Sequence, residues 1–199
     1  MTDKLVIVGL LWAGYCIVHS VLAATSFKSR VQLIFKKKFK YYRLFYNLYA
    51  VAMLVIIIIY QLSFASPLIF IPNLITKISG ATITVIGVWI MGICIAKYFK
   101  QESGFLWMNP EMPAQKTELH ISGIHNYVRH PLYLGTFVFI WGLFILFPSA
   151  ANLVAVSIIT IYTLISIRFE EKKLIAEFGD AYKEYKRKVP MIIPKFKNS

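Results

Sequence analysis

Five long apolar runs divide this chain, and they constrain its fold more than any other feature. They lie at about residues 4–24, 44–65, 77–99, 132–147 and 151–167. A helix needs about 20 apolar residues to cross the hydrocarbon core of a bilayer; four of the runs approach that length, and 132–147 is shorter. Hydrophobic residues make up 58% of the 199 positions, and the mean hydropathy is +0.63. We therefore predict an all-α integral membrane protein with about five transmembrane helices.

Lysine and arginine lie mainly in three segments between or after these runs, and the first of these segments, residues 28–43, is expected to be a loop that joins two helices. Of the 22 Lys and Arg residues, 20 fall within residues 28–43, 97–129 and 168–199, and five crossings place all three segments on one side. Cytoplasmic segments of membrane proteins carry the excess of basic residues. We therefore predict a multi-pass protein of a bacterial inner membrane, with an outside N-terminus and a cytoplasmic C-terminus.

The net charge of +13 is accounted for by this topology and by attraction to anionic membrane lipid. Lipid is therefore an expected partner, and nucleic acid is not. Cys16 and Cys94 fall inside predicted helices and lack the spacing of zinc or redox motifs. We expect both to be small apolar core residues, and we expect no metal site.

The predicted organisation is a single domain over residues 1–199. Residues 1–99 supply three transmembrane helices. Residues 100–199 supply a cofactor-binding loop, a helical hairpin that turns near residues 148–152, and a cytoplasmic helical tail.

The two arms of this hairpin are predicted to return to the same height. Pro131 lies 19 residues before Ala150, and Arg168 lies 18 residues after it, so equal rise per residue brings both ends level. The cluster Arg129-His130-Pro131 should therefore lie beside the cluster Arg168-Phe169-Glu170-Glu171.

Local signals define how the chain enters and leaves these helices. Proline suits the first turn of a helix and excludes the preceding residue from it, so His130 before Pro131 should be irregular and accessible. The second arm is predicted to continue to a C-cap at Gly179, with Asp180 as the N-cap of the next helix. Residues 189–194 should form an extended strap.

The junction of the two clusters offers groups for a ligand that carries both signs of charge. The N-terminus of the helix that begins at Pro131 favours a carboxylate. Glu170 and Glu171 can accept an ammonium group or ribose hydroxyls. Further hydrogen bonds are available from four side chains: His125, Tyr127, His130 and Tyr133.

S-adenosylmethionine carries a carboxylate, an ammonium group and ribose hydroxyls, so it matches both the helix N-terminus and the two glutamates. Methyl transfer from it mainly requires correct alignment. In the alternative interpretation, Arg129 is only a topology charge. The two glutamates then pair with Lys172 and Lys173 on a solvated helix.

Two separated motifs also resemble a known superfamily. The first is Gly123-x5-Arg129-His130-Pro131-x-Tyr133-x-Gly135. The second is Glu170-Glu171-x2-Leu174-x3-Phe178-Gly179-x2-Tyr182-x2-Tyr185-x3-Val189-Pro190. In order and spacing they resemble the isoprenylcysteine carboxyl methyltransferase and phospholipid methyltransferase superfamily.

The resemblance implies that S-adenosylmethionine binds between the cytoplasmic ends of the hairpin and the tail, and that a lipophilic or small-molecule acceptor enters from the bilayer. The implied cofactor residues are Thr117, Glu118, Leu119, His120, His125, His130, Pro131, Leu132, Tyr133, Glu170 and Glu171. Two positions depart from the isoprenylcysteine enzymes. His125 replaces a usual tyrosine. Ser166 stands at the place of the substrate-side arginine, for which Arg168, half a turn away, is the candidate.

The first apolar run carries polar residues on one face. Trp12, Cys16 and His19 recur at helical spacing, and the stretch 15–23 resembles the His-Ser helix of NnrU-like proteins and methanethiol S-methyltransferases. This resemblance implies that His19 is a catalytic residue on the acceptor side. In the alternative interpretation, His19 only forms a hydrogen bond with a neighbouring helix.

The sequence therefore predicts an S-adenosylmethionine-dependent membrane methyltransferase whose acceptor is a thiol, carboxylate or amine. Two alternatives stay open. One is an NADPH-dependent membrane reductase of the sterol-reductase type, which has a similar Arg-x-Pro and Tyr pattern but is generally longer. The other is a non-enzymatic membrane protein that retains the pocket.

Overall fold

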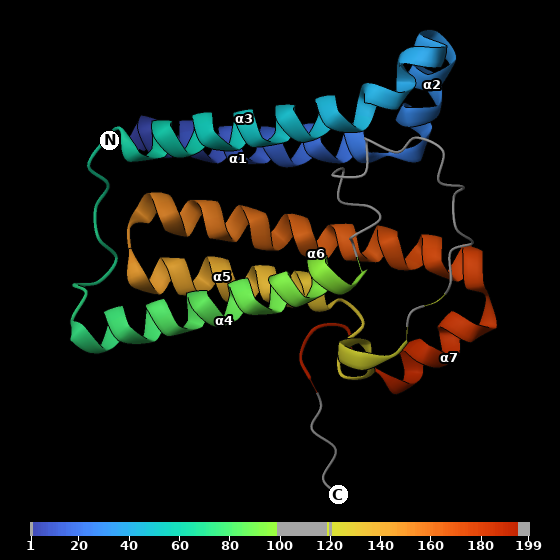
Figure 1. Ribbon diagram of the computed structural model, residues 1–199. Coiled ribbons are helices and arrows are strands. Elements are labelled where there is room, and N and C mark those ends of the chain that lie inside the picture. The colour runs from blue at the N-terminus through green and yellow to red at the C-terminus, as the bar shows by residue number, and fades with distance from the viewer. Residues whose placement is uncertain (1, 99–118, 120, 195–199) are drawn as a thin grey trace, which may run out of the picture. The chain divides into compact units, whose positions relative to one another are not determined.

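The computed structural model describes residues 2–98, 119 and 121–194, and these residues are almost entirely helical (Figure 1). The elements are α1 (Thr2–Ala23), α2 (Thr25–Phe35), the 3-10 helix η1 (Lys36–Tyr41), α3 (Tyr42–Leu62), α4 (Leu74–Tyr98), the 3-10 helix η3 (Gly123–Asn126), α5 (Pro131–Leu146), α6 (Ala150–Phe178) and α7 (Asp180–Lys188). The all-α prediction is confirmed.

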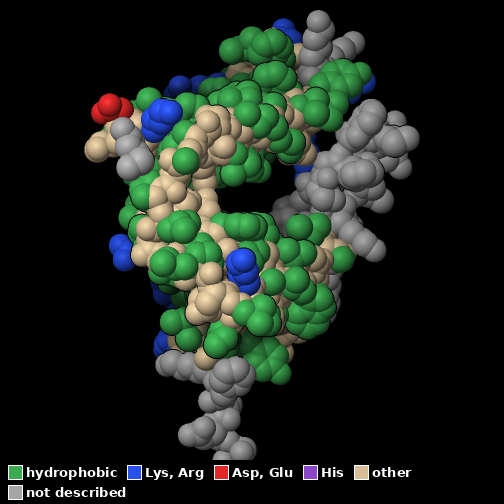
Figure 2. All heavy atoms as spheres, turned by 90° about the vertical axis from the view of Figure 1, so that its left-hand side faces the viewer, with side chains coloured by type: hydrophobic (Ala, Val, Ile, Leu, Met, Phe, Trp, Pro, Cys, Tyr) green, Lys and Arg blue, Asp and Glu red, His purple; other side chains and the backbone are tan. Residues whose placement is uncertain are grey.

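Four of these helices are long and apolar enough to cross a membrane: α1, α4, α6 and the segment Phe39–Leu62 that contains α3. The helix α5 has 16 residues and is shorter than the others, so the fifth crossing stays a prediction. Hydrophobic side chains cover much of the face seen in Figure 2, and charged side chains interrupt them only in places.

One expectation for the first half of the chain is wrong. The basic segment 28–43 was expected to be a loop, but it is helical through α2, η1 and the start of α3. Thr25–Phe35 contains neither Gly nor Pro, so nothing in it interrupts a helix. The helix α2 ends where Lys36 adopts a positive φ of 40°.

The chain divides into two compact units, and the first comprises the described residues 2–71 and 148–159. Its apolar core contains Val8, Trp12, Ile57 and Ala155, from α1, α3 and the start of α6. A chain of polar side chains accompanies this core. The Trp12 indole donates to Gln61 over 2.8 Å, and the Gln61 amide donates to Asn152 over 2.6 Å. Polar groups at membrane depth need such partners.

The second unit contains α4, α5, the rest of α6 from Thr160, and α7. Its helices α4 and α5 approach so closely that side chains cannot fit between them. A Cβ atom added to Gly142 would lie 2.6 Å from the Thr84 backbone nitrogen, and one added to Gly80 would lie 2.7 Å from that of Leu146. Four glycines form this seam, which we call the glycine seam: Gly80, Gly87, Gly135 and Gly142. Along α4, Gly80 faces Leu146 and Gly87 faces Phe139, so the order of the partners is reversed along α5 and the two helices run antiparallel.

The connection between α6 and α7 depends on one glycine. Gly179 has a φ of 57°, in the left-handed region that favours glycine. Its N–H donates to the Ile175 carbonyl over 2.9 Å, so the predicted C-cap is confirmed. The predicted N-cap is wrong by one residue, because Gly179 occupies that position and Asp180 already lies in the first turn of α7.

Candidate active site

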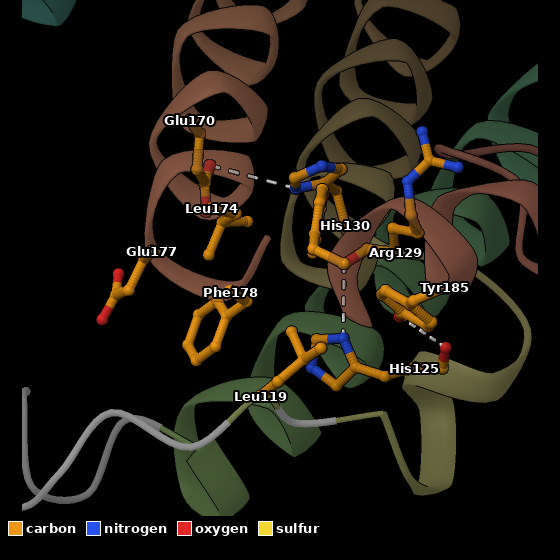
Figure 3. A pocket seen from close by; sticks show the side chains of 10 residues that line it. Leu119, His125, Arg129, His130, Glu170, Leu174, Glu177, Phe178 and Tyr185 are labelled. Carbon is orange, nitrogen blue, oxygen red and sulfur yellow. Dashed lines mark hydrogen bonds and ion pairs between the residues drawn. The ribbon is translucent and has the colours of Figure 1, made fainter. Parts of the chain in front are cut away.

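A pocket lies in the second unit, where α6, α7, η3 and the start of α5 meet (Figure 3). Its volume is about 180 Å³. The residues that line it are Leu119, His125, Arg129, His130, Glu170, Leu174, Glu177, Phe178, Tyr182 and Tyr185. The predicted meeting of the Arg-His-Pro and Glu-Glu clusters is therefore confirmed.

One face of α6 supplies an alternating acidic and apolar wall. Glu170, Leu174, Glu177 and Phe178 recur at intervals of four, three and one residues, which places them on one side of the helix. Figure 3 shows Glu170 facing His130, with Leu174 and Phe178 below it. The Glu170 side chain is 44% exposed, and its carboxylate lies 3.9 Å from the His130 Nδ1 atom. This wall suits a ligand that has a cationic or hydroxyl group and an apolar portion.

His130 lies immediately before α5 and is irregular, as predicted. Its φ of −121° and ψ of 67° are not helical, and Pro131 begins the helix. The expected accessibility is wrong, because His130 is only 5% exposed. Its backbone N–H donates to the Met191 carbonyl over 3.1 Å, and its Nε2 atom lies 3.4 Å from the Glu171 carboxylate.

The environment of His130 keeps its imidazole neutral. Burial lowers the pKa of His130 below its usual 6.5, and this effect outweighs the nearby Glu170 and Glu171 carboxylates, which raise it. Arg129 lowers the pKa further. A neutral imidazole has one donor and one acceptor nitrogen, so His130 can both donate to and accept from a ligand.

Arg129 and Glu171 form a buried ion pair, and each side chain is 7% exposed. The Arg129 Nε and Nη2 atoms donate to Glu171 Oε1 over 2.8 and 2.5 Å. The other carboxylate oxygen accepts from Lys186 over 2.6 Å. The Arg129 Nη1 atom donates to the carbonyls of Lys186, over 3.1 Å, and of Val189. We call these four residues the Arg129 hub.

The Arg129 hub excludes one of the interpretations made from the sequence. Arg129 is not merely a topology charge, because its guanidinium joins α6 to the C-terminal end of α7. Glu171 pairs with Arg129 and Lys186, and not with the neighbouring Lys172 or Lys173. Such a pair holds its helices in a fixed arrangement because a buried charge needs its partner.

Hydrogen bonds also hold the 3-10 helix η3 next to the Arg129 hub. The His125 Nδ1 atom lies 3.3 Å from the Arg129 carbonyl oxygen, and the Tyr185 hydroxyl donates to the His125 carbonyl over 2.7 Å. Figure 3 shows both contacts. The Arg129 N–H donates to the Pro190 carbonyl over 2.9 Å. The predicted strap after Val189 therefore pairs with the residues that precede α5.

A comparison with known proteins shows which protein family this part of the chain matches. Residues 75–181, more than half of the sequence, match the profile of the phospholipid methyltransferase family. The chain belongs to the phospholipid methyltransferase family. This segment includes eight of the ten lining residues, from Leu119 to Phe178, and Tyr182 and Tyr185 follow directly after it.

Several curated proteins share segments with this family member. It is 49% identical to the methanethiol S-methyltransferase of Crocosphaera subtropica over 70 residues, which are 35% of this chain and 27% of the relative. It is 40% identical to methanethiol S-methyltransferase 1 of Bradyrhizobium diazoefficiens over 82 residues, 41% of this chain and 27% of the relative. The protein-S-isoprenylcysteine O-methyltransferase of Schizosaccharomyces pombe is 38% identical over 74 residues, 36% of this chain and 31% of the relative.

The matched segments thus span about a quarter to a third of the length of these relatives. No solved structure matches this family member. The family and its relatives, together with the four long apolar helices, identify the chain as an integral membrane protein.

The structure places the predicted cofactor residues in three groups. Lining the pocket are Leu119, His125, His130 and Glu170. Beside it, but not among the lining residues, are Pro131, Leu132, Tyr133 and Glu171; the Tyr133 ring is 5.7 Å from that of His130. Outside the described residues are Thr117, Glu118 and His120. Arg168 is exposed on α6 and does not line the pocket.

Sequence reasoning missed several lining residues of this family member. Leu174, Phe178 and Tyr182 were recognised as motif positions but not as walls of the pocket, and Glu177 was not recognised at all. The helical periodicity that starts at Glu170 would have identified three of them. The Tyr182 hydroxyl is buried and makes no hydrogen bond of standard geometry within the described residues. Burial raises the pKa of Tyr182, so this hydroxyl stays protonated.

His19 belongs to the first unit and is surrounded by tyrosines. It is half-buried, and the Tyr46 hydroxyl lies 2.9 Å from its Nε2 atom and 3.1 Å from its Nδ1 atom. The ring centroids of Tyr15 and Tyr46 lie 5.7 and 5.2 Å from that of His19. Tyr46 is on α3, so the predicted contact with a neighbouring helix exists. A catalytic role of His19 stays a prediction.

Proposed function

We propose that this protein is an S-adenosylmethionine-dependent methyltransferase of the membrane and that its acceptor is a small or lipophilic thiol. The observation that carries the proposal is that His130 and Glu170, from two separated motifs of the segment that matches the family, line one pocket. Most of the relatives named above are methyltransferases that act on methanethiol. A carboxylate acceptor is the alternative that the name of the yeast relative supports.

The chemistry of the pocket fits this cofactor. When bound, S-adenosylmethionine supplies an electrophilic methyl group on a positively charged sulfur. The carboxylates of Glu170 and Glu177 place negative charge in the wall that would face a cationic ligand. Leu119, Leu174 and Phe178 offer apolar surface for a planar base.

The size of the pocket fits only part of such a molecule. Complete small-molecule sites enclose roughly 300–1,000 Å³, and the described residues enclose about 180 Å³. We therefore assign the described residues to one portion of the ligand. Thr117, Glu118 and His120 are proposed to hold the remainder.

Methyl transfer depends on alignment more than on acid or base chemistry, and the chain offers a rigid frame for it. Glu170 can accept hydrogen bonds from an ammonium group or from ribose hydroxyls. The neutral His130 can donate to a ligand carboxylate or accept from a hydroxyl. The Arg129 hub joins the neighbour of His130 to the neighbour of Glu170, which keeps these two groups on facing segments.

Calorimetry on the purified protein tests the cofactor assignment. S-adenosylhomocysteine should bind and NADPH should not. Glu170→Ala should weaken S-adenosylhomocysteine binding by about 1.5–3 kcal/mol, because a charge-assisted hydrogen bond is lost. Glu184→Ala is the matched control, since Glu184 is an exposed carboxylate of α7 that pairs with Lys188 away from the pocket lining. Binding of NADPH alone would instead support the reductase.

We assign the acceptor side to His19. A neutral imidazole can accept the proton of a thiol, so His19→Ala should lower methyl transfer by roughly 10²–10⁴ at saturating cofactor. Tyr46→Phe, which removes the hydroxyl next to the imidazole, should lower it less, and Tyr49→Phe on the same helix should have no effect. Cofactor affinity should stay unchanged in all three. Wild-type turnover of His19→Ala with both methanethiol and a prenylcysteine analogue would make His19 structural.

Arg168 distinguishes the two acceptor classes. Its guanidinium can form a charged, two-hydrogen-bond contact with a carboxylate but not with a neutral thiol. Arg168→Ala should therefore slow methylation of a prenylcysteine carboxylate and leave methanethiol turnover unchanged. Equal loss with both acceptors would mean that Arg168 does not act through the acceptor.

The proposed topology has five crossings, an outside N-terminus and a cytoplasmic C-terminus in a bacterial inner membrane. It is supported by the distribution of charge, since Lys4 and Lys77 are the only basic residues outside the three basic segments. Cysteines introduced at Asn73 and Lys188 should react from opposite sides of the membrane. Reaction of both with an impermeant reagent in intact cells would contradict the model of five crossings.

A further inference from the structure

The helix α2 lies at the point where the chain leaves one apolar helix and enters another. Only Ala24 separates it from α1, and η1 connects it to α3. Figure 1 shows α2 and η1 together at one end of the α1–α3 pair. Since both neighbours are long and apolar enough to cross a membrane, α2 begins within a few residues of the bilayer surface.

One face of α2 is apolar and is only partly covered within its own unit: Phe27 and Val31 are half-buried, and Ile34 and Phe35 are exposed. Phe27, Val31, Ile34 and Phe35 recur at intervals of four, three and one residues and therefore share this face. None of the residues of α2 is buried, and Ile34 and Phe35 are 72% and 55% exposed. At a bilayer surface, such a face can enter the boundary between headgroups and acyl chains.

Cationic side chains border this apolar face on both sides. At about 100° per residue, Arg30 projects about 40° from Ile34, and Lys28 projects about 20° from Phe35 on the opposite edge. Thr25, Ser29 and Gln32 occupy the remaining side, where Leu33 is the apolar exception. Long basic side chains at the edge of an apolar face can lay their methylene groups on it and reach the headgroup level with their charge.

These cations have no carboxylate nearby in the sequence. The chain contains no Asp or Glu between Asp3 and Glu102, and Asp3 is at the opposite end of α1. The next residues, in η1, add Lys36 and Lys40. An apolar face bordered by cations that have no carboxylate near them in the sequence is complementary to an anionic phospholipid, which supplies both acyl chains and a phosphate.

We propose that α2 is an interfacial helix and that Lys28 and Arg30, with Lys36 and Lys40 of η1, bind the headgroups of anionic phospholipids. A free phosphate would satisfy the cations but would leave Ile34 and Phe35 in water, so the lipid is the occupant that the helix fits. The proposal concerns the first unit alone and does not depend on the proposed enzymatic function.

Spin labels on the full-length protein test the placement of α2. In a Cys16→Ala/Cys94→Ala background, one cysteine is introduced at Ile34 on the apolar face or at Ser29 on the polar face. The protein is placed in nanodiscs of phosphatidylcholine alone or mixed with phosphatidylglycerol. The ratio of collision rates with oxygen and with a water-soluble nickel chelate should be several-fold higher at residue 34 than at residue 29 in the mixed membrane. Equal ratios at the two positions would overturn the interfacial helix.

Charge reversal tests the headgroup site. Lys28→Glu/Arg30→Glu should lower the ratio at residue 34 in the mixed membrane to the value found in phosphatidylcholine alone. Lys183→Glu/Lys188→Glu changes the net charge equally on α7 and should leave the ratio unchanged. A ratio that is the same in both membranes, or that falls equally with both double variants, would overturn the headgroup site.

A second readout avoids the cysteine-free background. Native mass spectrometry of wild-type protein extracted from mixed membranes should show retained phosphatidylglycerol in preference to phosphatidylcholine. The Lys28→Glu/Arg30→Glu variant should lose this preference, and Lys183→Glu/Lys188→Glu should keep it. Equal retention of both lipids by the wild type would contradict the proposal.

Discussion

The helix α5 is held by two different kinds of contact along its length. In its interior, Gly135 and Gly142 bring its backbone against α4 through the glycine seam. At its start, the Arg129 hub holds the preceding residues with ion pairs and backbone carbonyls. Lipid tails are as apolar as the side chains of such helices, so burial of apolar surface does little to drive helix association in a bilayer. Close packing must drive it instead. Where the chain leaves the lipid, charge and hydrogen bonds can take over.

Removing the charge from the Arg129 hub should give the largest loss of stability. Arg129→Ala leaves Glu171 buried with Lys186 and the His130 imidazole as its described partners and frees the carbonyls at the end of α7. The cost should be about 3–5 kcal/mol, the range for breaking a buried pair from one side. Unfolding in mixed micelles titrated with SDS would measure it. Arg168→Ala, which removes an exposed arginine from α6, should cost under about 0.5 kcal/mol. Similar losses in both variants would contradict a structural role for the hub.

A methyl group added in the glycine seam should cause the next largest loss of stability. A Cβ atom at position 87 would collide with the Phe139 backbone, and overpacking of this kind costs typically about 1–3 kcal/mol. Gly92→Ala on the same helix is the matched control. Nothing lies within 4 Å of the added atom there, so the substitution should be neutral or stabilising by up to about 1 kcal/mol. If Gly87→Ala matched Gly92→Ala in the same SDS titration, the close approach of α4 and α5 would be wrong.

Protonation of His130 should change the free energy of unfolding less than either Arg129→Ala or Gly87→Ala. Its pKa is lowered in the folded protein, so the unfolded chain takes up the proton first. The stabilising contribution is then complete above about pH 6.5 and decreases as the pH is lowered through that value towards the folded pKa. Thermal unfolding between pH 7.5 and 5.5 would show this decline.

The His130→Gln variant provides the control for that titration and should show a shallower decline. Asp180 and Glu184 do not contribute within this window, because Lys183 and Lys188 lower their carboxyl pKa values below the usual range. An identical decline in wild type and His130→Gln would assign the pH dependence to other groups.

The sequence predicted the meeting of the two motifs because that step needs only two helical arms of equal length. It also predicted the ends of the helices at Pro131 and Gly179, where backbone chemistry acts locally. It failed where the partner is distant. The burial of His130 depends on Met191, and the role of Arg129 depends on carbonyls at the end of α7. No periodicity within one segment encodes such pairs.

The glycine seam shows the same limit in another form. The spacing of seven residues between Gly80 and Gly87, and between Gly135 and Gly142, is visible in the sequence. Its meaning emerges only when α4 and α5 are aligned in opposite directions, with each glycine facing the other backbone. The helix α2 was missed for a different reason: the density of basic residues obscured an apolar face that spans only 11 residues.

The pairing of Arg129 and His130 with Pro190 and Met191 also determines when the site can form during synthesis. The ribosome makes α5 first, then α6 and α7, and only afterwards the two carbonyls that complete the start of α5. The segment before α5 therefore obtains these two backbone partners only after every described residue that lines the pocket has been made. A chain truncated before Pro190 would contain those lining residues but would lack the carbonyls that fix Arg129 and His130, so the end of the strap helps to set the geometry of a site that it does not line.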